Sequence, residues 1–188
     1  MKKLLIASLC VTALLGACAS NTPMSGGMNP VTVGGAAMYP NKDIIDNAVN
    51  SADHTTLVAA VKAAGLVDTL KSPGPFTVFA PVNSAFAALP AGTVETLLKP
   101  ENKATLTKVL TYHVVPGRVN AADLVKQIGM GGGRAALKTV SGGTLYASMS
   151  GANVIITDES GGAARVTIAD VNQSNGVIHV VDKVLLPK

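Results

Sequence analysis

The chain has 188 residues, 48% of them hydrophobic, and its formal net charge is +4. This length suits one domain, whose core must be aliphatic because tryptophan is absent and phenylalanine and tyrosine number three each. Without Lys2 and Lys3, which belong to a predicted export segment, thirteen basic and eleven acidic side chains remain with no basic run, which argues against a nucleic-acid-binding protein.

The first residues have the order of an export signal. Met1-Lys2-Lys3 is positively charged, and the apolar run 4–15 that follows is shorter than the roughly 20 residues of a membrane-spanning helix. We therefore predict a signal peptide over residues 1–17. The run ends in Leu15-Gly16-Ala17-Cys18, which resembles a bacterial lipobox. The resemblance implies that Cys18 carries palmitate-type acyl chains as the new N-terminus. The alternative is an ordinary cleavage after Ala19.

The predicted lipid also accounts for the cysteines. Cys10 leaves with the signal peptide and Cys18 is acylated, so no thiol pair remains for a disulfide. Ala19 follows the cysteine where an aspartate would direct inner-membrane retention, so the lipobox resemblance implies an outer-membrane lipoprotein.

Residues 18–40 are predicted to be the lipidated cysteine and a flexible tether. The stretch Ala19–Pro40 has no charged residue, is rich in Gly, Ser, Asn and Pro, and shows no apolar period. Its methionines could suggest a copper(I) site, but their spacing is irregular and no histidine accompanies them, so no metal site is predicted.

The folded domain is predicted over residues 41–188. Helical spacing and capping residues indicate helices over 44–49, 54–64, 83–88, 94–98, 100–113 and 121–128. In this scheme Asp53 and Asn83 are N-caps, and Gly65 ends the second helix. Short apolar runs between turn residues indicate strands over 76–80, 144–149, 154–157, 165–171 and 177–181. Helices followed by strands favour an α+β fold.

Two separated segments resemble the conserved boxes of the fasciclin domain. The first box is Thr77-Val78-Phe79-Ala80-Pro81-Val82-Asn83-Ser84-Ala85-Phe86, and the second box is 175–187, Asn-Gly-Val-Ile-His-Val-Val-Asp-Lys-Val-Leu-Leu-Pro. The pair Tyr112-His113 between them is similar to the family's Tyr-His motif. Val82 departs from the first box, where the family usually has Thr, and Val171 stands where the family has Ile. The resemblance covers 43–187 and is that of a bacterial single-domain fasciclin lipoprotein. It implies a β-wedge with helices packed against it.

The resemblance also implies a function and a set of contacts. Fasciclin domains act as adhesion or matrix-contact modules, and the family's contact segments correspond here to Tyr112-His113 and Asp170-Val171. Read from the residues alone, His113 lies on an apolar helix face and fits a hydrogen-bonded core histidine, whereas Asp170 fits an exposed group. Asn175-Gly176 is expected to form a tight turn with φ > 0.

Other chemistry finds no support in the sequence. The three histidines have no metal-ligand spacing, and the Gly-rich segment 129–134 lacks the pattern of a phosphate-binding loop and is interpreted as a mobile loop. Because no catalytic set of residues can be placed on one site, we predict a non-enzymatic protein without cofactor or metal.

The sequence therefore predicts an envelope-anchored adhesion or interaction module. Its partners would be an envelope or matrix protein or a glycan, and the membrane through the lipid, with the domain itself a monomer. It would face the periplasm or the exterior, or alternatively be secreted. The alternative function is a periplasmic binding protein for a small apolar ligand held in a groove between the helices and the wedge.

Overall fold

The structure is a computed structural model that describes residues 30–188. The signal peptide, Cys18 and the tether up to residue 29 lie outside these residues. Five helices lie before residue 100: α1 (Ile44–Ala48), α2 (Thr55–Ala64), α3 (Val67–Lys71), α4 (Asn83–Ala87) and α5 (Thr93–Leu98). Two more follow, α6 (Lys103–Tyr112) and α7 (Ala121–Met130), and 3-10 turns cover Ala52–His54 and Pro100–Asn102.

The strands form a small hairpin and one large sheet. The hairpin is β1 (Val31–Val33) and β2 (Ala36–Met38). The sheet contains β3 (Phe76–Pro81), β4 (Val114–Pro116), β5 (Arg134–Lys138), β6 (Thr144–Ser150), β7 (Asn153–Thr157), β8 (Ala163–Gln173) and β9 (Gly176–Val181). Its seven strands lie in the order β4-β3-β9-β8-β7-β6-β5.

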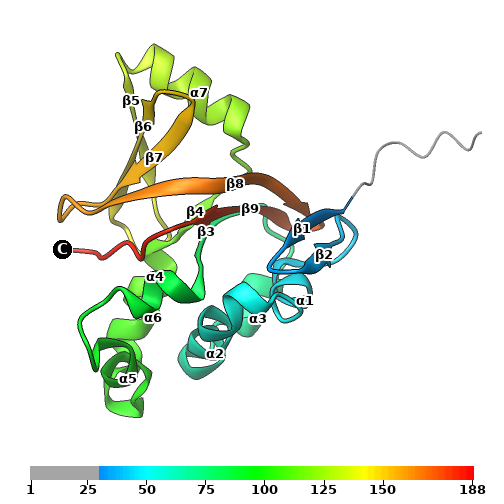
Figure 1. Cartoon of the computed structure of the whole chain (residues 1–188), viewed down its shortest axis with the longest axis vertical. Helices are drawn as coiled ribbons and strands as arrows, with labels where there is room; N and C mark the ends of the chain where they lie inside the picture. Colours follow the sequence, from blue (N-terminus) through cyan, green and yellow to red (C-terminus); the bar gives the residue numbers. More distant parts are fainter. Residues whose placement is uncertain (1–29) are drawn as a thin grey trace, which may run out of the picture.

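The sheet is curled and mixed (Figure 1). Its neighbouring strands are antiparallel except for β3 and β9. Strand β8 pairs with β7 through residues 163–165 and with β9 through residues 166–173, with two register shifts between Val166 and Val171. A backbone hydrogen bond of 2.8 Å from Val140 N to Val114 O joins the segment after β5 to β4, so the sheet nearly closes on itself. The α+β wedge predicted from the sequence is confirmed.

The two sequence boxes lie side by side because β3 and β9 are the parallel pair. Phe79 is the register partner of His179, and their rings stack with centroids 5.6 Å apart. All six residues of β9 are buried, which confirms the central strand predicted from its apolar faces. Two segments remote in sequence thus form one continuous structural unit.

Two hydrophobic clusters flank this central pair. The first cluster lies under α1, α2, α3 and α6 and includes Ile45, Leu57 and Ile178. The second lies under α7 and includes Leu124, Leu145 and Ile156. Figure 1 shows the two helical groups at opposite ends of the sheet, with α7 near β5 and β6 and the other helices below β3 and β9.

The predicted boundary between tether and domain is wrong. Residues 31–38, assigned to the tether, form the β1–β2 hairpin, and Val33 and Met38 are each only 2% exposed. Gly34 and Gly35 have φ values of +57° and +75°, which a tight hairpin turn requires. The Gly-Gly pair between short apolar runs was the available signal. The folded domain therefore begins no later than Val31 instead of at residue 41.

Two predicted roles of conserved-box residues are also corrected. Asn83 does not cap its own helix: its Oδ1 accepts from Thr56 N at 3.0 Å, at the first turn of α2. Neither Asn175 nor Gly176 has a positive φ. Gly176 is required because a Cβ there would lie 2.1 Å from the carbonyl oxygen of Phe76 in the neighbouring strand.

Within the segment 129–134, α7 ends at Met130 and β5 begins at Arg134, so the predicted loop is reduced to a turn over residues 131–133. Helix α3 and strands β4 and β5 were not predicted. Each has at most five residues, too short for a clear apolar period.

Candidate functional site

Tyr112 lies at the end of α6 and is fully buried. Its hydroxyl donates to Thr144 O at 3.0 Å and accepts from Glu159 N at 3.0 Å. Burial raises the pKa of this phenol, so it stays protonated and continues to donate. The side chain thus joins α6 to β6 and to the turn after β7, and it is not available as a contact for a partner.

His113 follows at the C-terminus of α6 and is 3% exposed. Its Nε2 accepts from Leu185 N at 3.0 Å, so the proton of the neutral ring sits on Nδ1, which donates to Val109 O at 2.8 Å. Burial lowers its pKa to about 4. Both ring nitrogens serve the fold, as the reading of His113 as a core histidine predicted.

Asp170 occupies an irregular part of β8 and is half-buried. Its φ of +57° is the only positive value of a non-glycine residue among the described residues. The carboxylate Oδ1 accepts from Ala121 N at 2.7 Å, at the first residue of α7. Asp170 therefore caps a helix from a neighbouring strand, where its negative charge is favourable. Val171, beside it, is 1% exposed and belongs to the first hydrophobic cluster.

His179 supports Asp170 from the adjacent strand. Its Nδ1 accepts from Asp170 N at 3.3 Å and its Nε2 donates to Val119 O at 2.8 Å. Burial lowers the pKa of His179, which keeps the ring neutral and Nδ1 free to accept. The neutral ring thus holds the β8 irregularity against the loop that precedes α7.

Exposed side chains surround Asp170. Arg118 Nη2 donates to Gln173 O at 2.9 Å, and Asn172 Nδ2 donates to Asp170 O at 3.1 Å. The loop carrying Arg118 is held from below, because Thr77 Oγ1 donates to Gly117 O at 2.7 Å. We call Arg118, Asp170 and Asn172 the Asp170 corner. It is a polar surface that the fold holds in one geometry.

The structure does not bring the two predicted contact segments onto one surface. Tyr112 and His113 point into the packing of α6 against the sheet, whereas Asp170 lies by the start of α7. Of the four predicted binding residues, only Asp170 reaches solvent, and burial corrects the expectation that the other three side chains are contacts themselves. Arg118 and Asn172 were not predicted from the sequence. They become candidate contact residues only because the fold places them beside Asp170.

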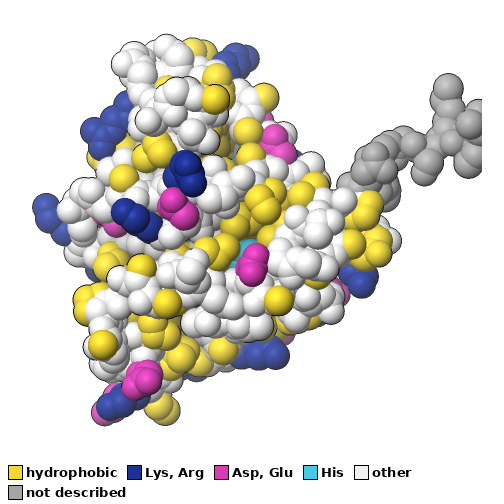
Figure 2. Space-filling model, in the orientation of Figure 1, with side chains coloured by type: hydrophobic (Ala, Val, Ile, Leu, Met, Phe, Trp, Pro, Cys, Tyr) yellow, Lys and Arg dark blue, Asp and Glu magenta, His cyan; other side chains and the backbone are white. Residues whose placement is uncertain are grey.

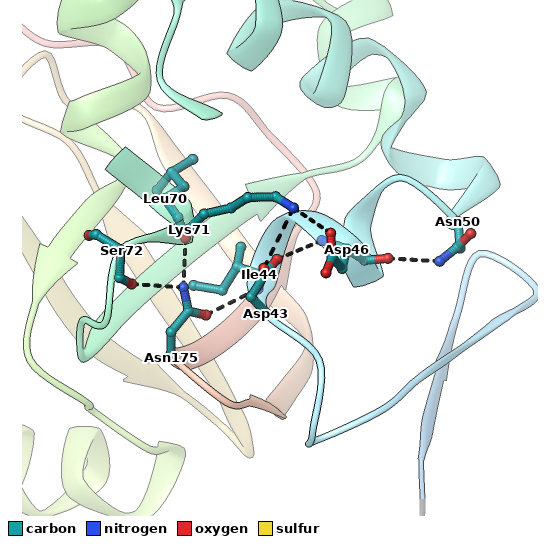
Figure 3. Close-up of polar contacts among 8 residues, drawn as sticks. All are labelled: Asp43, Ile44, Asp46, Asn50, Leu70, Lys71, Ser72 and Asn175. Carbon is teal, nitrogen blue, oxygen red and sulfur yellow. Dashed lines mark hydrogen bonds and ion pairs between the residues drawn. The ribbon is translucent and has the colours of Figure 1, made fainter. Parts of the chain in front are cut away.

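The segment around Asp43 is structural (Figure 3). Asp43 Oδ1 accepts from Asp46 N at 2.7 Å as the N-cap of α1, and Ile44 and Ile45 are buried. Lys71 Nζ lies 2.6 Å from Asp46 Oδ1, and this bond lowers the pKa of Asp46 and raises that of Lys71. The exposed ion pair fastens α1 to α3.

Asn175 ties the second box to the same two helices (Figure 3). Its Oδ1 accepts from Ile44 N at 3.1 Å, and its Nδ2 donates to Leu70 O at 2.7 Å and to Ser72 O at 3.1 Å. An asparagine is needed at position 175 because its buried amide bonds to three backbone groups, and not because the position forms a turn.

A cavity of about 60 Å³ lies within the first hydrophobic cluster. Side chains of the hairpin, the helices and the central strands line it, among them Met38, Ile45, Leu57 and Ile178. His54 also borders it, with Nδ1 2.9 Å from Ser51 Oγ and no hydrogen bond at Nε2. Burial lowers the pKa of His54, so the ring stays neutral. The cavity is suited to an apolar group.

Within residues 30–188, no three side chains of His, Cys, Asp or Glu converge as a metal site would require. Within the same residues, every helix falls short of the length and apolarity that crossing a membrane demands.

The chain is similar to known proteins over most of its length. A family model described as the fasciclin domain matches residues 52–187. Protein sll1483 of Synechocystis is 51% identical over 144 residues, which are 77% of this chain and 73% of that protein. Immunogenic protein MPB70 of Mycobacterium bovis is 35% identical over 167 residues, covering 84% of this chain and 74% of the relative.

Animal proteins match over a small part of their length or in fold alone. Transforming growth factor-beta-induced protein ig-h3 of Sus scrofa is 38% identical over 131 residues, 70% of this chain but 17% of that protein. A solved structure of a FAS1 domain pair from the insect cell adhesion molecule Fasciclin I superposes with a TM-score of 0.70 at 19% identity. The match covers 79% of this chain and 52% of the domain pair, which establishes a common fold.

Proposed function

The chain belongs to the fasciclin-domain family, and we propose that it is a non-enzymatic adhesion or matrix-interaction module held on the cell envelope by a lipid on Cys18. The observation that carries this proposal is the family match over the whole sheet and most of the helices. A FAS1 domain pair of the same fold belongs to an insect cell adhesion molecule. The partner would be an envelope or matrix protein or a glycan.

We place the contact surface at the Asp170 corner. Arg118 and Asn172 are exposed there, and both carry side-chain groups able to form hydrogen bonds to a partner. Asp170 acts as a positioning residue, because its carboxylate already binds the start of α7. A rigid polar surface loses little side-chain entropy on binding, which favours recognition.

Binding measurements on residues 19–188 would test this surface, since that piece keeps every described residue. The protein would be screened against isolated envelopes, matrix proteins and glycans. We expect Arg118→Ala and Asn172→Ala to weaken binding and Lys126→Ala, an exposed change on α7, to leave it unchanged. Circular dichroism would confirm that each variant folds. Binding that all three variants retain would place the contact elsewhere, and no binding by the wild type would contradict the adhesion function.

The envelope location rests on the lipobox resemblance of residues 15–18. We propose an outer-membrane lipoprotein facing the periplasm or the exterior, with secretion as the alternative if cleavage occurs after Ala19. Growth of the host with an alkyne analogue of palmitate would label the protein, and Cys18→Ala would abolish the label. An unlabelled wild-type protein in the culture medium would support secretion instead.

The cavity supports a second candidate function, the binding of a small apolar ligand. An engineered apolar cavity of about 150 Å³ binds benzene, so a cavity of about 60 Å³ admits a smaller apolar molecule or part of a larger one. Its place between the helices and the sheet is where the sequence analysis put such a groove. Native mass spectrometry of protein purified from its host would reveal a bound compound, and a mass equal to the lipidated chain alone would count against this function.

A further inference from the structure

One face of strands β5 to β8 carries no helix. In β5 and β6 the side chains of Ala135, Leu137, Leu145 and Ala147 are buried in the second hydrophobic cluster, under α7. Because side chains alternate along a strand, their neighbours point to the opposite face. These outward residues on β5, β6, β7 and β8 include Arg134, Lys138, Tyr146, Ser148, Ile155, Thr157 and Arg165. We call them the basic sheet face.

The strand register places these residues in rows. Arg134 is the partner of Ser148 in β6, Ser148 is the partner of Ile155 in β7, and Ile155 is the partner of Arg165 in β8. A row across four strands separates its ends by about 14 Å, since neighbouring strands lie about 4.8 Å apart. The two arginines therefore stand at opposite ends of one row, with polar and apolar groups between them.

The basic groups of this face are held in place by uncharged neighbours. The guanidinium of Arg134 lies 3.8 Å from the ring centre of Tyr146, a cation–π contact that leaves its N–H edge free to donate. Lys138 Nζ donates to Thr144 Oγ1 at 3.0 Å and keeps further protons for a ligand. Among residues 30–188, neither Arg134 nor Lys138 has a carboxylate within 4.0 Å.

Two acidic residues border the face, and both have partners. Asp182 Oδ2 lies 3.8 Å from Arg165 Nε, and Glu159 Oε1 accepts from Thr144 N at 2.9 Å. In Figure 2 several Lys and Arg side chains lie along the left side of the molecule with acidic ones beside them, and others lie at the top, right and lower edges. The uncompensated positive charge of this face therefore rests on Arg134 and Lys138.

We propose that the basic sheet face binds an acidic polysaccharide. A partner with repeated carboxylate or sulfate groups matches Arg134 and Lys138, the two cations without a carboxylate neighbour at the ends of β5, whereas a single small anion would reach only one of them. The hydroxyls of Ser148 and Thr157 on the neighbouring strands β6 and β7 can bond to sugar hydroxyls. The inference goes beyond the proposed function, because it assigns a second binding surface, separate from the Asp170 corner, and names the class of partner for that surface.

The affinity of such a face depends on salt and on repetition. Exposed charges each contribute little and are screened at high ionic strength. A polymer that presents many equivalent sites raises the apparent affinity through effective concentration. The face would therefore bind an acidic polysaccharide strongly and a single acidic monosaccharide weakly.

The test uses residues 19–188 with heparin as the sulfated probe, polygalacturonate as the carboxylated probe and dextran as the neutral one. We expect binding to at least one acidic polymer, none to dextran, and release by about 0.5 M salt. The double variant Arg134→Ala/Lys138→Ala should bind about tenfold more weakly, as two exposed charge contacts imply. The matched control Lys62→Ala/Lys103→Ala removes the same charge from α2 and α6 and should bind as the wild type does.

Equal losses in the two double variants would show attraction by net charge alone and would overturn the proposal. Failure to bind either acidic polymer, or equal binding to dextran, would also overturn it. These results are separable from the proposed function. If envelope binding depends on Arg118 and Asn172 while acidic polymers do not bind, the adhesion function stands and only the second binding surface is wrong.

Discussion

His113 makes the stability of this protein sensitive to acid. The folded structure accepts only the neutral ring, because Leu185 N–H already points at Nε2 and a proton there would oppose it. Burial lowers the pKa of His113 from 6.5 to about 4. A tenfold change in an ionisation equilibrium corresponds to about 1.4 kcal/mol, so the two values differ by about 3 kcal/mol in free energy of unfolding.

The sign follows from which state binds the proton. The unfolded chain takes up a proton on His113 near pH 6.5, whereas the folded protein does so only near pH 4. The stabilisation is therefore complete above about pH 6.5 and is lost as the pH falls toward about 4. The pKa values of His54 and His179 are also lowered, so these residues too reduce the free energy of unfolding as the pH falls. A variant is therefore needed to isolate the contribution of His113.

The variant His113→Gln provides that comparison. Glutamine keeps an amide oxygen that can accept from Leu185 N and does not titrate. Free energies of unfolding would be measured in urea by far-UV circular dichroism, because the chain has no tryptophan for fluorescence. We expect the variant to be less stable at pH 7 and its deficit to shrink by about 3 kcal/mol by pH 4. A deficit independent of pH would refute the assignment of His113 as a neutral core residue.

Three further changes test the packing, each by urea unfolding at pH 7. Tyr112→Phe removes a hydroxyl with two backbone partners and leaves Glu159 N–H without its acceptor, which should cost about 1–3 kcal/mol; no loss would contradict the buried bond. Asn175→Ala removes a buried amide that serves three backbone groups and should cost about 3 kcal/mol or more, whereas a loss below about 1 kcal/mol would show that water replaces it. Met38→Ala should cost about 2–5 kcal/mol if the hairpin belongs to the core, and an unchanged stability would show that the hairpin is not part of the folded domain.

The extent of prediction differs between the fold and the candidate site. Family resemblance and apolar spacing predicted the α+β wedge, the central position of 177–181 and the core setting of His113. Side-chain roles that depend on remote partners were not predictable. Asn83 caps a helix that precedes it in the chain, and Gly176 is needed because of a carbonyl in another strand. The residues that flank Asn83 and Gly176 in the sequence do not indicate these partners in space.

The sequence by itself determined the class of the protein, since apolar periods and the two boxes are local patterns that each segment carries alone. Only the tertiary structure decided which side chains face solvent. Sheet pairing and helix packing buried Tyr112, His113 and Val171 and left Arg118 and Asn172 exposed beside Asp170. The same pairing gathered Arg134, Lys138 and Arg165 onto one face from two strands, because proximity across a sheet follows from register and not from distance along the chain.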